Sequence, residues 1–107
     1  MKINNILVPV DGSKYSVRAL KHAIDLAKKH NANLSLIHVI DDSRVIVFVS
    51  RKEYLNELRN FGKKVLEKAT RITEKREVKS EQVMKEGKPA EQILNFLKKG
   101  FHFFLED

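Results

Sequence analysis

Cysteine is absent from this chain of 107 residues. Its absence excludes disulfides, a thiol nucleophile and thiolate metal sites, and it is compatible with a reducing compartment. Long hydrophobic runs are also missing, because the longest run without proline is Val45–Val49, which is far too short to span a membrane. The first residues lack the apolar stretch of a secretory signal. We therefore expect a cytoplasmic protein that has no membrane contact.

Two common phosphate-binding motifs are missing as well. No G-x-x-x-x-G-K-[ST] occurs, which excludes a P-loop, and no G-x-G-x-x-G follows the first apolar run, which excludes a dinucleotide-binding turn. His38 has no Asp, Cys or second His at ligand spacing, so we interpret it as a packed, hydrogen-bonded residue and expect no metal site. Ser13 has no His nearby to activate it. Catalysis therefore has little support, and we expect no appreciable hydrolysis.

The charge is the one bulk property that points toward nucleic acid, because the chain carries a net +7 and a basic surface attracts phosphates. However, Lys and Arg alternate with Glu and Asp along residues 51–77, a pattern typical of a solvated helix face. No aromatic residues interleave with the basic ones to form a stacking platform. Nucleic acid is therefore an unlikely partner.

An apolar run at residues 6–10 leads into Asp11, Gly12 and Ser13 and then into a helical pattern. A continuous apolar run is typical of a strand that is covered on both faces, glycine permits a tight turn, and serine is a good helix N-cap. Ligands of open α/β sheets bind outside the carboxyl ends of strands, so Asp11 lies where a ligand group is expected. The alternative is that Asp11 only shapes the turn.

The remaining pattern predicts a single domain over residues 1–107, which is long enough to bury about two-thirds of its unfolded surface. The predicted strands are 6–10, 34–40, 78–86 and 101–105, and the predicted helices are 13–30, 51–76 and 89–99. This order predicts a mostly parallel open sheet with helices on both faces, a three-layer α/β/α fold. The charged third strand suits an edge position. The run Val45–Val49 stays unassigned, as an extra strand, a flap over the site or a partner patch.

Several segments in combination resemble the universal stress protein family. They are Ile6–Ser13 with Tyr15-Ser16 and Ala19-Leu20, then Ala23–Ala27, Leu34–Val39 and Glu86–Ile93. The resemblance implies a Rossmann-like, five-stranded parallel sheet of the adenine-nucleotide alpha-hydrolase type and a role as a binding or regulatory module in the stress response. One branch of the family binds ATP, with the adenosine at the ends of the first and second strands.

The resemblance also implies which residues form the site. Those that would line the adenosine pocket are Pro9, Val10 and Asp11 from the first strand and Val39 and Ile40 from the second. Asp11 is the best candidate for a polar contact with the nucleoside. Residues with a possible accessory role are Gly12, Ser13 and Gly87.

The sequence departs from the ATP-binding branch after residue 100. In that branch the fourth strand leads into a G-x-x-G-x(9)-G-[ST] loop that holds the phosphates, then a helix and a fifth strand, and none of these is present here. Each charge-assisted hydrogen bond to phosphate is worth roughly 1.5–3 kcal/mol, so the loss of three weakens ATP binding about a thousandfold. We therefore expect a residual adenine-nucleotide pocket with weak or lost ATP affinity. Lys88 also replaces the usual acceptor at a helix N-cap, which limits compensation there.

The same departure affects the partners that we expect. The fourth strand, about residues 101–105, is aromatic and would lie at an open edge that invites pairing with another chain, as a homo-oligomer or a heteromer. Three origins of this departure stay open: a truncated gene product, a frameshift near residues 100–101 and a reduced paralogue. Two other functions also stay open: an ATP-binding switch that is completed by a partner chain or downstream sequence, and a basic nucleic-acid-associated protein.

Overall fold

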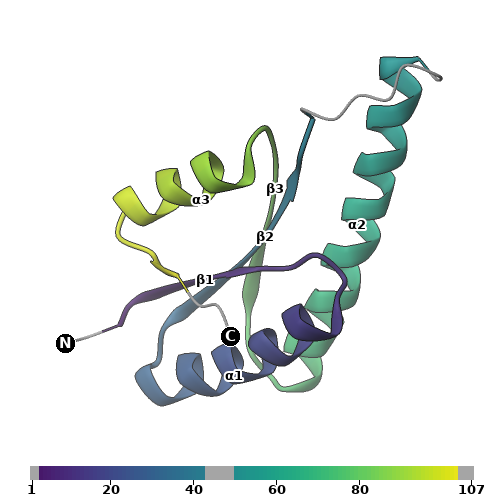
Figure 1. Cartoon of the computed structure of the whole chain (residues 1–107). Helices are drawn as coiled ribbons and strands as arrows, with labels where there is room; N and C mark the ends of the chain where they lie inside the picture. The colour runs from purple at the N-terminus through teal and green to yellow at the C-terminus, as the bar shows by residue number, and fades with distance from the viewer. Residues whose placement is uncertain (1–2, 43–49, 104–107) are drawn as a thin grey trace.

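Strands and helices alternate along the chain, in the order that the apolar spacing predicts (Figure 1). The computed structural model describes residues 3–42 and 50–103. Its elements are β1 (Asn5–Pro9), α1 (Lys14–His30), β2 (Asn33–Ile40), α2 (Arg51–Lys75), β3 (Ser80–Glu86), α3 (Pro89–Lys98) and β4 (His102–Phe103). The unassigned run Val45–Val49 lies outside the described residues.

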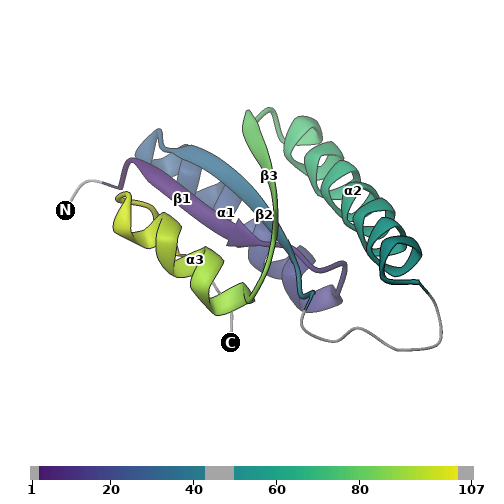
Figure 2. The ribbon, with the colours of Figure 1, turned by 90° about the horizontal axis from the view of Figure 1, so that it is seen from above.

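The four strands form one sheet in the order β3-β2-β1-β4, with every neighbouring pair parallel. Helices α1 and α2 cover one face of this sheet and α3 lies on the other (Figure 2). The predicted three-layer fold is therefore confirmed, as is the edge position of β3. The direction of winding reverses at β1, since β2 and β4 lie on opposite sides of it, and such switch points are where open α/β sheets bind ligands.

The central strand β1 carries the core. Ile6, Leu7 and Val8 are fully buried, which explains why this segment reads as a continuous apolar run rather than an alternating one. Consecutive side chains of a strand point to opposite faces. Ile6 and Val8 accordingly join the cluster beneath α1 and α2, together with Val10, Leu20, Ala23, Ile24, Ala27, Leu34, Leu36, Val65, Leu66 and Ala69.

Helix termini follow the expected capping chemistry. The Ser13 Oγ accepts a hydrogen bond from the Ser16 N–H at 3.1 Å and begins α1. Ser50 does the same for α2 through the Glu53 N–H at 3.1 Å. By contrast, Lys88 precedes α3 without a side-chain cap, and α3 has no buried residue.

Two predicted strands begin later in the structure than the sequence predicts. The third begins at Ser80 rather than Val78 because the Val78 N–H donates to the Thr73 carbonyl at 3.0 Å, which keeps Val78 in the turn after α2. The fourth begins at His102 rather than Phe101, and residues 104 and 105 lie outside the part of the chain that the structure describes. Phe101 packs edge-to-face on Phe96 of α3, with ring centroids 5.3 Å apart, so this aromatic residue belongs to the helix–strand connection.

Candidate nucleoside pocket

A cavity of about 330 Å³ opens at the carboxyl ends of β1 and β2, beside the first turns of α1 and α3. This volume lies at the lower end of the range for small-molecule sites. The lining residues are Pro9, Val10, Asp11, Ser13, Tyr15, Ser16, Ala19, Ile37, His38, Val39, Pro89 and Ile93. The cavity therefore lies where the fold favours a ligand, and its walls are mostly apolar.

Five of the eight residues that the sequence implicates line this cavity, namely Pro9, Val10, Asp11, Ser13 and Val39. Ile40 does not line this cavity; it lines a second cavity beside α2, to which Val39 also contributes. The reason is the pleat of the strand, since Val39 and its neighbour Ile40 face opposite sides of the sheet. The contact of Ile40 with a bound nucleoside therefore stays a prediction.

The two accessory glycines also lie elsewhere. Gly12, with φ +87°, adjoins α2, because a Cβ at this position would lie 3.4 Å from Val65 Cγ2. Gly87, with φ +133°, does not line the cavity, and its N–H donates to the Ile40 carbonyl at 2.9 Å. Both glycines shape backbone turns beside the site.

Most of the lining residues that the sequence reasoning missed belong to helices; the others are Ile37 and His38 of β2. The structure adds Tyr15, Ser16 and Ala19 from the start of α1 and Pro89 and Ile93 from the start of α3. The first turns of helices that follow sheet strands adjoin the strands' carboxyl ends, so their residues were available as candidates. The pairing of the α1 start with the α3 start depends on tertiary packing, which spacing alone does not reveal.

Asp11 shapes the β1–α1 turn in addition to lining the cavity. Its Oδ1 accepts a hydrogen bond from the Ser13 backbone N–H at 2.8 Å. The pKa of Asp11 is lowered, chiefly by hydrogen bonding with the Ser13 side chain; partial burial opposes this effect, and the Ser13 N–H adds to it. Asp11 therefore stays anionic at neutral pH, which suits it to accept hydrogen bonds from ligand hydroxyls and makes it repel phosphates.

His38 holds the end of β1 in place. Its Nδ1 lies 2.8 Å from the Val10 carbonyl oxygen, and because a carbonyl only accepts, Nδ1 carries the proton. The ring is half-buried and lies against Phe61 of α2, with centroids 6.0 Å apart. This confirms the interpretation of His38 as a packed, hydrogen-bonded residue.

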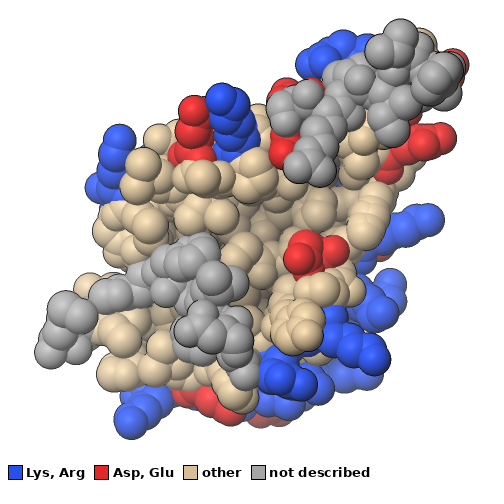
Figure 3. Space-filling view, in the orientation of Figure 1, with Lys and Arg blue, Asp and Glu red and all other residues tan. Residues whose placement is uncertain are grey.

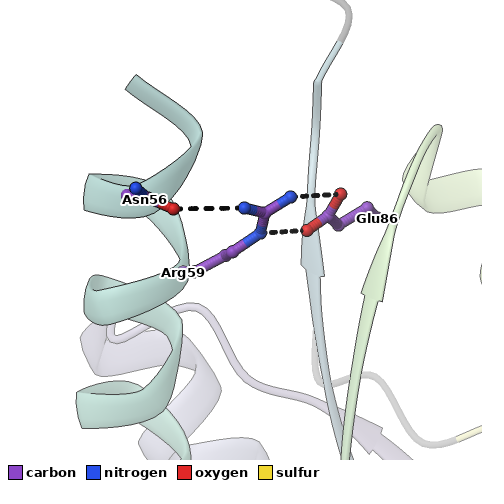
Figure 4. Close-up of polar contacts among 3 residues, drawn as sticks. All are labelled: Asn56, Arg59 and Glu86. Carbon is purple, nitrogen blue, oxygen red and sulfur yellow. Dashed lines mark hydrogen bonds and ion pairs between the residues drawn. The ribbon is translucent and has the colours of Figure 1, made fainter. Parts of the chain in front are cut away.

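A second polar contact fixes the end of β3 to α2 (Figure 4). Arg59 donates from Nε to Glu86 Oε1 at 2.5 Å and from Nη2 to Oε2 at 3.2 Å, while Nη1 donates to Asn56 Oδ1 at 3.2 Å. The hydrogen bond from Arg59 lowers the pKa of Glu86. The pair is bidentate, which gives it defined geometry although it is solvent-exposed.

These two carboxyls predict how stability responds to acid. The folded-state pKa of both Asp11 and Glu86 lies below the usual carboxyl value. The unfolded chain therefore binds more protons in acid, and the stability that these groups contribute is full above about pH 5 and is lost as the pH falls below about 4. Urea unfolding at a series of pH values across this range measures the predicted loss of stability. A Glu86→Gln variant should show a shallower decline than the parent, and an unchanged slope would contradict the role of the Arg59 contact.

The charges around the cavity are unfavourable for phosphates. On the face in Figure 3, Lys and Arg side chains lie around the margin and the middle is largely uncharged. Asp11 is the one charged side chain in the cavity lining among the described residues, and no Lys or Arg belongs to it. Within residues 3–42 and 50–103 there is also no group of His, Asp or Glu that could hold a metal ion.

No helix in the described ranges is long and apolar enough to cross a membrane.

A larger cavity, of about 520 Å³, lies between α1 and α2. Of the predicted site residues, only Val10 and Gly12 line it. Position favours the smaller cavity as the nucleoside site, because it opens at the carboxyl ends of the strands next to the switch point.

Comparison with known proteins adds independent information. A sequence model described as the universal stress protein family matches residues 2–100. Universal stress protein YxiE of Bacillus subtilis is 37% identical over 105 residues, which cover 89% of this chain and 71% of that protein. A universal stress protein of Methanocaldococcus jannaschii is 36% identical over 97 residues, which cover 88% of this chain and 57% of that protein.

Solved structures share the fold. A universal stress protein family member from Burkholderia pseudomallei superposes with a TM-score of 0.81 at 23% identity, covering 96% of this chain and 82% of that one. A universal stress protein in complex with cAMP gives 0.71 at 17% identity, covering 98% and 77%. An Arabidopsis thaliana family member with AMP bound gives 0.67 at 17% identity, covering 94% and 76%.

Proposed function

Because this chain belongs to the universal stress protein family, we propose that it is a regulatory module of the cytoplasmic stress response that binds the nucleoside part of an adenine nucleotide. The ligand occupies the cavity at the carboxyl ends of β1 and β2. Support comes from the position of the cavity at the switch point of the sheet and from two proteins of this fold whose structures contain cAMP or AMP.

The observation that carries the proposal is the combination of apolar walls with a single carboxylate. Val39, Ile93 and Ala19 offer surfaces against which a purine ring can pack. Asp11 offers an acceptor for ribose hydroxyls beside them. Without a Lys or Arg in the described lining, phosphates gain little, so the nucleoside carries most of the affinity and hydrolysis is not expected.

The proposal predicts how affinity depends on the ligand. Calorimetric titration should show adenosine and AMP binding with similar affinity and ATP binding no tighter than either. The physical reason is that added phosphates meet the Asp11 carboxylate rather than a cationic side chain. ATP affinity in the micromolar range, far above that of adenosine, would contradict the assignment of affinity to the nucleoside.

A single substitution tests whether the nucleotide binds in the cavity at the ends of β1 and β2. In Val39→Trp the indole fills the cavity, so AMP affinity should fall by about tenfold or more, or about 1.4 kcal/mol. Leu94→Trp is the matched control, because Leu94 is 51% exposed on α3 and lies outside the lining. Equal AMP affinity in Val39→Trp and the parent, with both folded, would reject this cavity.

A second candidate is an ATP-binding switch that a partner chain completes. The observation that favours it is the position of β4 at the edge of the described sheet, where another strand can pair. Such a partner would supply the phosphate-binding groups that the described lining lacks. ATP affinity that rises with protein concentration, in parallel with self-association, distinguishes this switch from the nucleoside module.

A further inference from the structure

A cavity of about 520 Å³ forms a groove between α1 and α2 that the proposed nucleotide function does not use. Its inner wall is apolar: Leu20 and Val65 are buried, Ala69 is 6% exposed, and Val17 and Ile72 are half-buried. Phe61 lies in its lining with 46% of its surface exposed. A large aromatic residue left this accessible beside a concave apolar wall indicates room for a ligand.

Two adjacent stripes of residues on α2 line the groove. One stripe is apolar, and the other is polar and basic. Phe61, Val65 and Ile72 form the apolar stripe, at spacings of four and seven residues. Phe61 and Ile72 are eleven positions apart, which corresponds to about 17 Å of helix. An apolar surface that extends along a helix in this way can accommodate a linear aliphatic chain.

The second stripe is polar and carries two lysines. Lys64 and Lys68 lie one helical turn apart in the groove lining. Neither side chain makes a hydrogen bond or ion pair with another residue in the part of the chain that the structure describes. Glu57, the acidic residue of the lining, is seven residues from Lys64, or about 10 Å along the helix. An anionic group beside Lys64 and Lys68 therefore meets net positive charge.

We propose that this groove binds an amphipathic carboxylate, with its aliphatic chain on the apolar stripe and its carboxylate between Lys64 and Lys68. One negative charge on a flexible tail matches both the shape and the charge of the groove. The alternative is that the lysine stems simply cover apolar surface and leave their ammonium groups in water. The site is distinct from the nucleoside cavity, although both are lined by Val10 and Ser16.

Titration with dodecanoate below its micellar concentration tests the proposal on the full chain. The double variant Lys64→Gln/Lys68→Gln should bind dodecanoate about tenfold more weakly, because it loses two exposed charge contacts with the carboxylate. The matched control is Lys21→Gln/Lys63→Gln, which removes two exposed lysines that lie outside the groove. The control should retain parental affinity, and dodecanol, which lacks the charge, should bind more weakly than dodecanoate.

Methyl NMR spectra of the same titration locate the ligand. The signals of Leu20, Val65 and Ile72 should shift, and those of Ile93 should not. Equal dodecanoate affinity in both double variants would overturn the proposal, since the stems of Lys64 and Lys68 would then only cover apolar surface without binding the carboxylate. Groove signals that shift with protein concentration alone would also overturn it, because a second copy of the chain would then be the occupant.

Discussion

Ile24→Ala is expected to lower the free energy of unfolding by about 2–5 kcal/mol, the largest effect among the substitutions considered. Ile24 is fully buried in the cluster that joins α1 to β1, β2 and α2. Truncation removes apolar contacts and leaves a cavity that the surrounding side chains fill incompletely. Alanine has a high helix propensity, so the loss of stability does not come from a weaker preference of residue 24 for the helical conformation. Urea unfolding monitored by circular dichroism measures it.

Leu94→Ala is the matched control for this prediction, since it is also an aliphatic-to-alanine change within a helix. Leu94 is 51% exposed on α3, a helix with no buried residue. Its substitution should change the free energy of unfolding by no more than about 0.5 kcal/mol. Comparable losses in the two variants would mean that α3 contributes as much to the core as α1, contrary to the described packing.

Gly62→Ala is expected to destabilise the protein by about 1–3 kcal/mol, although alanine in a helix normally stabilises by about 1 kcal/mol relative to glycine. A Cβ at Gly62 would lie 2.7 Å from His38 Cδ2 and 2.8 Å from Met84 Sδ. The Met84 side chain is flexible and moves cheaply. The His38 ring is held by its hydrogen bond to Val10, so its displacement also costs that bond.

A double-mutant cycle isolates the steric cause. In a His38→Ala background the ring is gone, so Gly62→Ala should be neutral or should stabilise the protein by up to about 1 kcal/mol. Gly62→Ala that stabilises the parent chain would show that α2 does not approach β2 this closely. AMP affinity should also fall in Gly62→Ala, because the displaced ring releases the end of β1 at the nucleoside cavity.

The sequence predicted the fold closely because its strongest signals are local. The apolar run at residues 6–10 reflects a central strand covered on both faces. Ser13 and Pro89 mark helix starts that the structure confirms. The ends of β3 and β4 were less predictable, because they depend on contacts such as that of Phe101 with Phe96.

The sequence indicated where the candidate site lies, but it identified only some of the residues that line the cavity. A strand end is visible in the sequence, whereas the face to which each side chain points becomes clear only with the sheet in place. Val39 and Ile40 are both apolar, yet only Val39 lines the cavity at the ends of β1 and β2. Gly62 lies within α2, and nothing local in the sequence indicates that His38 lies against it. Tertiary packing determines both outcomes.

The central claim, that the cavity at the ends of β1 and β2 holds an adenine nucleoside, is tested most directly by intermolecular NOE spectroscopy on the isotope-labelled chain with AMP. The account predicts NOEs from the adenine protons to the methyl groups of Val39 and Ile93, which line this cavity from β2 and α3. NOEs to Leu20 and Val65 in the α1–α2 groove instead, or bound AMP without NOEs to Val39 and Ile93, would contradict it.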